Sequence, residues 1–145
     1  MKILIMNGPN LNMLGVREPE KYGTKTLDEI NSEISEYCGE KGIEAEFFQS
    51  NYEGALIEKI HSARGVFDGI VLNAGAFTHY SYALRDAIPI AEIPVIEVHL
   101  TDIKTREDFR KISVISPVCV CQISGFGDKS YIKGVEALEK YYADK

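Results

Sequence analysis

The chain has 145 residues, of which 45% are hydrophobic and 26% are charged, so neither long disorder nor a fibrous repeat is expected. Its 16 basic and 22 acidic side chains give a formal net charge of −6, which argues against the extended basic surface that nucleic-acid phosphates require. No stretch reaches the roughly 18 apolar residues of a membrane-spanning helix, so no membrane partner is expected. The length suits one domain over residues 1–145.

Alternating apolar and amphipathic runs predict a regular series of strands and helices. In chain order they are strand 2–6, helix 26–40, strand 43–49, helix 52–64, strand 67–72, helix 80–91, strand 94–98, a short helical turn 104–109, strand 118–123 and helix 131–142. Thr26 and Glu29 form a capping box at the start of the first helix. Strands that are continuously apolar and alternate with helices predict an α/β fold, in which a doubly wound parallel sheet of about five strands is covered on both faces.

The three cysteines, Cys38, Cys119 and Cys121, favour reduced thiols and a cytoplasmic location, because an odd number does not suit a disulfide framework. The sequence Asn7-Gly8-Pro9 interrupts the apolar amino end too soon for a signal-peptide core of about 7–15 residues. On a strand, Cys119 and Cys121 would share one face, and we interpret them as packed core thiols. No metal site is predicted, because the histidines lie elsewhere in the sequence.

Unusual polar residues collect at the carboxyl ends of the predicted strands, where open α/β sheets bind ligands. They are Asn7, Asn10 and Asn12 after the first strand, Asn73 and His79 after the third, and Glu97, His99, Thr101 and Asp102 at and after the fourth. Glu97 and His99 are two residues apart on a strand and therefore point to the same face. A carboxylate beside an imidazole suits acid–base chemistry, although a lone histidine on an apolar strand is more often a satisfied core residue.

The segment from Gly8 to Thr24 predicts a functional loop, because about 17 residues without evident structure are uncommon in a small domain. It contains Arg17 and Tyr22, and Gly15 and Gly23 flank this pair. A free tyrosine has a pKa of about 10, so a base at neutral pH needs roughly 4 kcal/mol in favour of phenolate. A cation at about 4 Å supplies about 1 kcal/mol in water and about 4 kcal/mol at an effective dielectric of 20. Arg17 could therefore activate Tyr22 only in a loop that closes and excludes water.

Considered together and in order, these residues resemble the type II 3-dehydroquinate dehydratases, over a region from Lys2 to about Tyr142. The motifs that carry the resemblance are Asn7-Gly8-Pro9-Asn10-Leu11-Asn12, Arg17-Glu18-Pro19 with Tyr22-Gly23, Asn73-Ala74-Gly75-Ala76 with Thr78-His79, Ala83-Leu84-Arg85-Asp86-Ala87, Glu97-Val98-His99-Leu100, Arg106-Glu107-x-Phe109-Arg110 and Ser116-Pro117. Some positions depart from the family pattern: Tyr80 and Tyr82 are bulky, Ser130 replaces a glycine before Tyr131, and Leu100-Thr101 is a conservative variant of the usual aliphatic–serine pair.

The resemblance implies a flavodoxin-like three-layer sandwich and a carbon–oxygen lyase that dehydrates 3-dehydroquinate to 3-dehydroshikimate through an enolate, without a cofactor. This is the third step of the shikimate pathway to chorismate. Tyr22 would be the base, Arg17 the cation that activates it, and His99, held by Glu97, the acid. Asn10 would organise the enolate site. The substrate-binding residues that the resemblance implies are Asn73, His79, Leu100, Thr101, Arg110 and Asp86. Asp86 would act across a subunit contact in a homo-oligomer, a dodecamer of trimers.

Two other classes of protein share this type of fold. A flavin or nucleotide module predicts a Ser/Thr/Gly-rich phosphate loop after the first strand, whereas this chain has Asn-Gly-Pro-Asn there and Pro9 has no amide hydrogen. A phosphoacceptor domain predicts an aspartate after the third strand, where Asn73 stands. The sequence from Gly125 to Ser130 is similar to a dinucleotide loop, but it lacks the third glycine and follows the last strand, so we interpret it as a turn.

Overall fold

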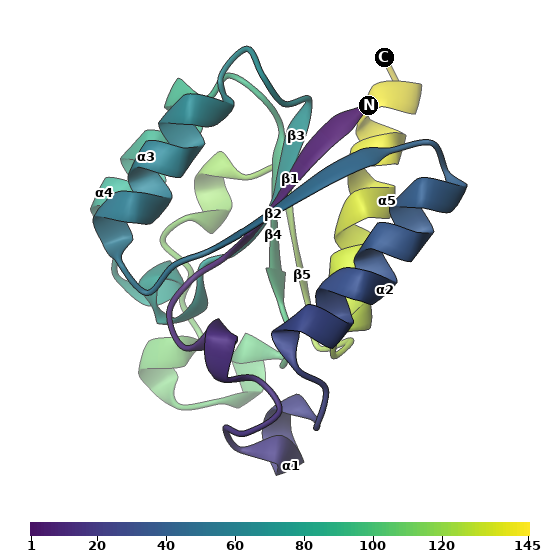
Figure 1. Cartoon of the computed structure of the whole chain (residues 1–145). Coiled ribbons are helices and arrows are strands. Elements are labelled where there is room, and N and C mark those ends of the chain that lie inside the picture. The colour runs from purple at the N-terminus through teal and green to yellow at the C-terminus, as the bar shows by residue number, and fades with distance from the viewer.

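A computed structural model describes residues 1–145 and shows a five-stranded parallel sheet between two layers of helices (Figure 1). The helices and strands are, in chain order, β1 (Lys2–Asn7), α1 (Pro19–Tyr22), α2 (Leu27–Glu40), β2 (Glu44–Gln49), α3 (Glu53–Ala63), β3 (Gly69–Asn73), α4 (Tyr82–Ile90), β4 (Val95–His99), β5 (Cys121–Ser124) and α5 (Lys129–Ala143). Short 3-10 helices lie in the connections, at Leu11–Met13, Gly75–His79, Ile103–Thr105, Asp108–Arg110 and Ser116–Val118. The predicted α/β fold class is confirmed.

The strand order β2-β1-β3-β4-β5 determines where a ligand site can form. The chain leaves β1 toward β2 on one side and then crosses to β3 on the other, so the order reverses between β1 and β3. At such a switch point the two outgoing loops separate and leave a crevice beyond the carboxyl ends of the strands. Both termini lie at the opposite end of the sheet, whereas α1 lies at the carboxyl end (Figure 1).

Alternate residues of the central strands supply two separate cores. Ile3 and Ile5 of β1 belong to the core beneath α2 and α5, whereas Leu4 and Met6 belong to the core beneath α3 and α4. All four side chains are fully buried. A strand covered on both faces must be apolar at every position, which is why β1 has no alternation in its sequence.

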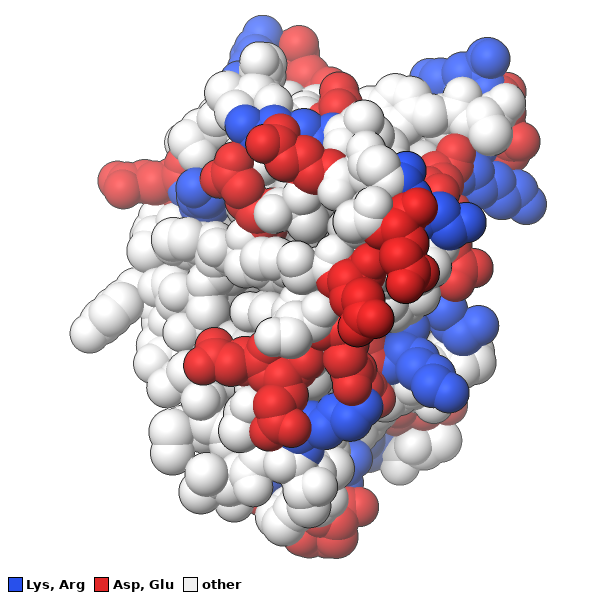
Figure 2. All heavy atoms as spheres, turned by 45° about the vertical axis from the view of Figure 1, so that its right-hand side comes forward, with Lys and Arg blue, Asp and Glu red and all other residues white.

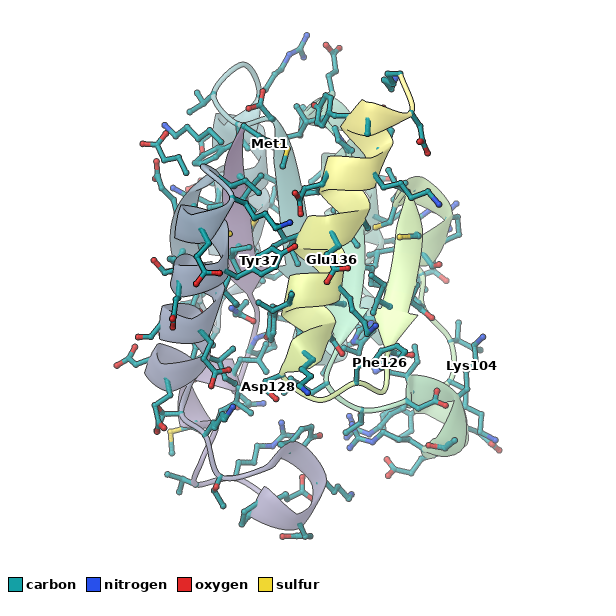
Figure 3. The ribbon with its side chains drawn as sticks, turned by 90° about the vertical axis from the view of Figure 1, so that its right-hand side faces the viewer. Met1, Tyr37, Lys104, Phe126, Asp128 and Glu136 are labelled. Carbon is teal, nitrogen blue, oxygen red and sulfur yellow. The ribbon has the colours of Figure 1, made fainter.

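The helices α2 and α5 are joined to each other as well as to the sheet. Tyr37 extends from α2 toward α5 (Figure 3), where its hydroxyl donates a hydrogen bond of 3.0 Å to Glu139. Burial and this carboxylate raise the pKa of Tyr37 to about 12, so the phenol stays neutral. The predicted capping box is confirmed, with Thr26 accepting from the Glu29 amide at 3.2 Å.

The surface over these two helices agrees with the acidic balance of the sequence. Figure 2 shows acidic side chains running across this face, with basic side chains beside them rather than in a continuous stripe. Exposed acidic residues of α2 that contribute are Asp28, Glu29, Glu33, Glu36 and Glu40. Separately, none of the helices combines the length and the apolar character that crossing a membrane demands.

Two local predictions were wrong. The last strand begins at Cys121 rather than at residue 118, because Pro117 lies in a 3-10 helix whose turns continue to Cys119. Cys119 and Cys121 therefore do not share a face: Cys119 packs against the α3–α4 core and Cys121 against the α2–α5 core. The loop from Gly8 to Thr24 is also not structureless, since it contains the 3-10 helix Leu11–Met13 and the single turn α1.

Candidate active site

A cavity of about 500 Å³, part of it open to solvent, lies beyond the carboxyl ends of β1, β3 and β4. We call it the strand-end cavity. Its lining comes from three segments that are distant in sequence: Pro9, Asn10, Leu11, Arg17, Tyr22, Asn73, Gly75, Ala76, His79, His99, Leu100, Thr101, Ile103, Arg106 and Arg110. Nine of the eleven residues proposed from the sequence are in this lining. The exceptions are Glu97, which lies behind His99, and Asp86.

The loops after β1 and β3 lie in direct contact, and this forms one wall of the cavity. The Gly8 amide donates to the Asn73 carbonyl at 2.8 Å. A Cβ atom on Gly8 would lie 2.5 Å from the Ala74 carbonyl oxygen, so only glycine permits this approach. The same contact uses the one free amide hydrogen of the Asn7-Gly8-Pro9 turn. The wall therefore offers no row of free amide groups for a phosphate.

The side chain of Asn73 is held by a buried tyrosine of α5. Tyr131, which is fully buried in α5, accepts a hydrogen bond of 3.0 Å from the Asn73 side chain and donates to the side chain of Asn7. The Asn73 side-chain oxygen accepts from the Gly75 amide at 3.1 Å. Burial raises the pKa of Tyr131, so it remains a neutral phenol. The orientation of the Asn73 amide is thus fixed by Tyr131 behind the cavity and by the backbone of Gly75.

Asn10 has a left-handed backbone, with φ of 69°. Few residues other than glycine and asparagine adopt this conformation readily. The Asn10 amide donates to the side chain of Asn51 at 2.9 Å, and Gln49 donates to the Gly8 carbonyl at 3.2 Å. The end of β2 and the residues that follow it therefore hold Asn10 in the lining of the cavity.

Glu97 and His99 lie side by side, as their spacing predicts. The His99 Nε2 atom is 2.5 Å from the Glu97 Oε2 atom, and both residues are buried. Because a carboxylate only accepts, Nε2 carries the proton in this pair. The Nδ1 atom of His99 is then free of Glu97 and is the nitrogen that can exchange a proton in the cavity.

His79 lies on the other side of the cavity, with the opposite tautomer. Its Nδ1 atom is 2.8 Å from the Ile112 carbonyl oxygen, so Nδ1 donates and Nε2 can accept. Burial lowers the pKa of His79, and the nearby charges of Arg110 and Arg106 act in the same direction, against the Ile112 bond that raises it. A neutral His79 at neutral pH suits the acceptance of a hydrogen bond from a hydroxyl group.

Tyr22 ends α1 in the lining of the cavity and lies close to two arginines. The guanidinium carbon of Arg17 is 4.8 Å from the centre of the Tyr22 ring, and that of Arg106 is 5.5 Å from it. Gly15 and Gly23, which bound this segment, have φ of 91° and 82°. Just beyond, Lys25 pairs with Glu33 at 2.6 Å and with Asp128 at 3.0 Å, which fastens the segment to α2 and to the start of α5. Asp128 is labelled in Figure 3.

The charge of the cavity is opposite to that of the whole chain. Three arginines line it, Arg17, Arg106 and Arg110, and no acidic residue or lysine does. A guanidinium binds a carboxylate with two parallel hydrogen bonds, so this lining suits an anionic substrate. The structure contains no group of three or more histidine, cysteine or acidic side chains arranged to hold a metal ion.

Comparison with known proteins identifies the family. The model of the family described as dehydroquinase class II matches residues 1–139. The chain belongs to the class II dehydroquinase family. The resemblance found in the sequence is therefore confirmed.

Curated relatives and solved structures agree with this assignment. A 3-dehydroquinate dehydratase from Geotalea daltonii is 54% identical over 95% of this chain and 96% of its own length. One from Chlorobaculum tepidum is 59% identical over 94% of this chain and 92% of its own length. The crystal structure of a type II dehydroquinase from Butyrivibrio crossotus superimposes with a TM-score of 0.94, at 52% identity, and covers 96% of this chain and 97% of that one.

In this class II dehydroquinase one charged lining residue was not predicted from the sequence. Arg106 lies near the Tyr22 ring, and its guanidinium is 3.5 Å from the Thr101 hydroxyl. Arg106 occurs in a motif that carried the resemblance. The segment around it contains several charged residues, and its sequence gave no reason to select Arg106 among them as a site residue. Arg110, which was selected, donates to Glu107 at 2.7 Å.

Asp86 is the one predicted site residue that this dehydroquinase chain does not bring near the others. It is exposed on α4 and lies outside the strand-end cavity. Its role was expected across a subunit contact, which a single chain does not contain, so that role stays a prediction.

Proposed function

We propose that this chain dehydrates 3-dehydroquinate to 3-dehydroshikimate through an enolate, with side chains alone. The observation that carries the proposal is that one cavity combines a phenol near two guanidinium groups with a buried carboxylate–imidazole pair. These are a base and an acid that face one substrate. The names of relatives that align over nearly the whole chain support the overall reaction.

In the first step Tyr22 removes a proton from the carbon next to the substrate ketone. The C–H electron pair moves into the carbonyl group and gives an enolate, and the proton passes to the phenolate oxygen. Arg17 stabilises the phenolate form of Tyr22 by its positive charge, and Arg106 adds a second charge on the same ring. Asn10, in the lining of the cavity, organises the enolate.

In the second step His99 protonates the departing hydroxyl group. The enolate re-forms the ketone, its electron pair makes the new carbon–carbon double bond, and the carbon–oxygen bond breaks to release water. The Nδ1 atom of His99 gives the proton, because Nε2 is engaged by Glu97. The Glu97 carboxylate stabilises the imidazolium form of His99 before the transfer.

The remaining polar lining binds the substrate. We assign the substrate carboxylate and hydroxyl groups to Asn73, His79, Leu100, Thr101 and Arg110. Arg110 supplies the cation for the carboxylate, and neutral His79 accepts from a hydroxyl group. Asn73, whose amide is fixed by Tyr131 and Gly75, contributes its remaining hydrogen-bonding capacity.

We further propose a homo-oligomer, a dodecamer of trimers, in which Asp86 of one chain completes the site of a neighbour. Exposed aromatic side chains support a contact with another chain, because Tyr80, Tyr82 and Phe109 are all more than half exposed. Light scattering that finds only monomers at catalytic concentrations would refute the assembly. A cytoplasmic location follows from the biosynthetic reaction and the free thiols, and cell fractionation tests it.

A spectrophotometric assay tests the reaction, because the product is a conjugated enone and the substrate is not. Ultraviolet absorbance should rise after 3-dehydroquinate is added, at the same rate with or without a metal chelator. No rise in absorbance would reject the reaction, and a rate abolished by the chelator would reject catalysis by side chains alone.

A further inference from the structure

Glu97 is the most deeply buried charged side chain at the site, with no exposed surface. Burying a carboxylate is costly unless hydrogen bonds replace the lost water. His99 supplies one of them. Two further donors come from segments outside the strand-end cavity: the Ser113 hydroxyl donates to Oε1 at 2.9 Å, and the Gln122 side chain donates to Oε2 at 3.0 Å.

Gln122 owes its position to the register of the sheet. It lies directly opposite Glu97 in the pairing of β4 with β5. Its neighbours Cys121 and Ile123 face the core beneath α5, so Gln122 faces the same side as Glu97. A glutamine is the one polar residue in the apolar run 118–123, and no other part of the mechanism uses it.

Three side chains contact the Glu97 carboxylate. The Ser113 hydroxyl, which also accepts from the Ser116 amide at 3.1 Å, donates to Oε1. The Gln122 amide and His99 Nε2 share the other carboxylate oxygen. These contacts replace the hydrogen bonds that water would otherwise give to the buried carboxylate.

Few other titratable groups act on this pair. The Cys119 thiol lies close enough for the Glu97 charge to raise its pKa further, but burial already raises that pKa, so Cys119 stays neutral. His79 is close enough to interact with His99, but the pKa of His79 is lowered, so His79 is neutral near pH 7. The groups that act most directly on Glu97 are therefore its three hydrogen-bond donors.

We propose that Gln122 is a positioning residue that stabilises the Glu97 carboxylate by a hydrogen bond and keeps it aligned with His99, so that His99 can act as the acid. This inference rests on the proposed roles of Glu97 and His99. Gln122 does not touch the cavity, so it acts on the chemical step and not on the binding of substrate.

The test compares Gln122→Leu with Ser124→Ala. Leucine fills a similar volume without a donor. Ser124 lies on the same face of the same strand, opposite His99, and makes no side-chain hydrogen bond to Glu97 or His99.

For Gln122→Leu we expect kcat to fall about 10-fold with KM unchanged within about twofold, because one hydrogen bond to a charged group is lost. The acidic limb of the kcat–pH profile should move to higher pH, because losing a donor favours protonation of Glu97. Ser124→Ala should match the wild type in both.

If the Gln122→Leu protein does not fold, Gln122→Met takes its place, because methionine has about the length of glutamine and also lacks the amide donor. Either variant with a wild-type kcat and pH profile overturns the role of Gln122. A 10-fold fall in kcat without a shift of the profile also overturns it, because this indicates only a packing defect. The His99→Ala variant separates the proposed acid role of His99 from the proposed positioning role of Gln122. If His99→Ala retains full turnover, the assignment of His99 as the acid is wrong. If His99→Ala is impaired but Gln122→Leu has normal turnover, only the role of Gln122 is rejected.

Discussion

The guanidinium group of Arg17 lies over the ring of Tyr22, with 4.8 Å between the guanidinium carbon and the ring centre. The Arg17 side chain is 31% exposed and its Nε atom is also 3.8 Å from Glu18. Solvent and a neighbouring carboxylate both weaken the effect of such a charge. Closure of the segment between Gly15 and Gly23 over the substrate would remove the solvent, and the proposed activation of Tyr22 depends on that closure.

Arg17→Gln should therefore depress kcat at neutral pH by at least about 10-fold, because each 1.4 kcal/mol of lost stabilisation is a factor of ten. The pH at which the base becomes active should rise, and part of the rate should return in alkaline buffer. Lys21→Gln is the matched control, because Lys21 is a cation on the same segment that pairs with Glu18 and does not line the strand-end cavity. An unchanged kcat with a raised KM in Arg17→Gln would show that Arg17 only binds substrate.

His99→Ala should uncouple the two steps of the reaction. Loss of the hydroxyl group should slow by roughly 100-fold, the lower range for a general acid, while removal of the neighbouring proton continues. Exchange of that proton with deuterated solvent, followed by NMR, should then outpace product formation. Equal losses of exchange and of elimination would contradict a separate acid.

The lowered pKa of His79 predicts a pH dependence of stability. Its folded pKa lies below the ordinary value of 6.5, because burial disfavours the charged ring. Below pH 6.5 the unfolded chain takes up the proton first, so the folded state loses stability as the pH falls toward the folded pKa. The thermal midpoint should fall less between pH 8 and pH 5.5 in His79→Gln, which can still donate to Ile112, than in the wild type. Identical slopes would refute this contribution.

No covalent imine should form, because no lysine lines the strand-end cavity. Borohydride added together with 3-dehydroquinate should leave activity intact and add no mass to the protein. A substrate-sized adduct on any lysine, found by intact mass spectrometry, would overturn the enolate mechanism even if dehydration were observed.

The strands and the Glu97–His99 pair could be predicted because they depend on local periodicity. Two residues on one strand must share a face, whatever the rest of the fold does. Gln122 and Tyr131 could not be predicted as partners of site residues, because their contacts depend on strand register and on how α5 packs across the sheet. Arg106 was missed for the same reason, since its proximity to Tyr22 joins two loops more than 80 residues apart in sequence.

Turnover and binding by Tyr22→Phe test the central claim most directly. Phenylalanine keeps the ring close to Arg17 and Arg106 but removes the oxygen that takes the proton. The account predicts that kcat falls by at least roughly 100-fold, as expected for a lost general base, while 3-dehydroquinate still binds in a calorimetric titration with near wild-type affinity. A Tyr22→Phe enzyme that forms the enone at nearly the wild-type rate would contradict it.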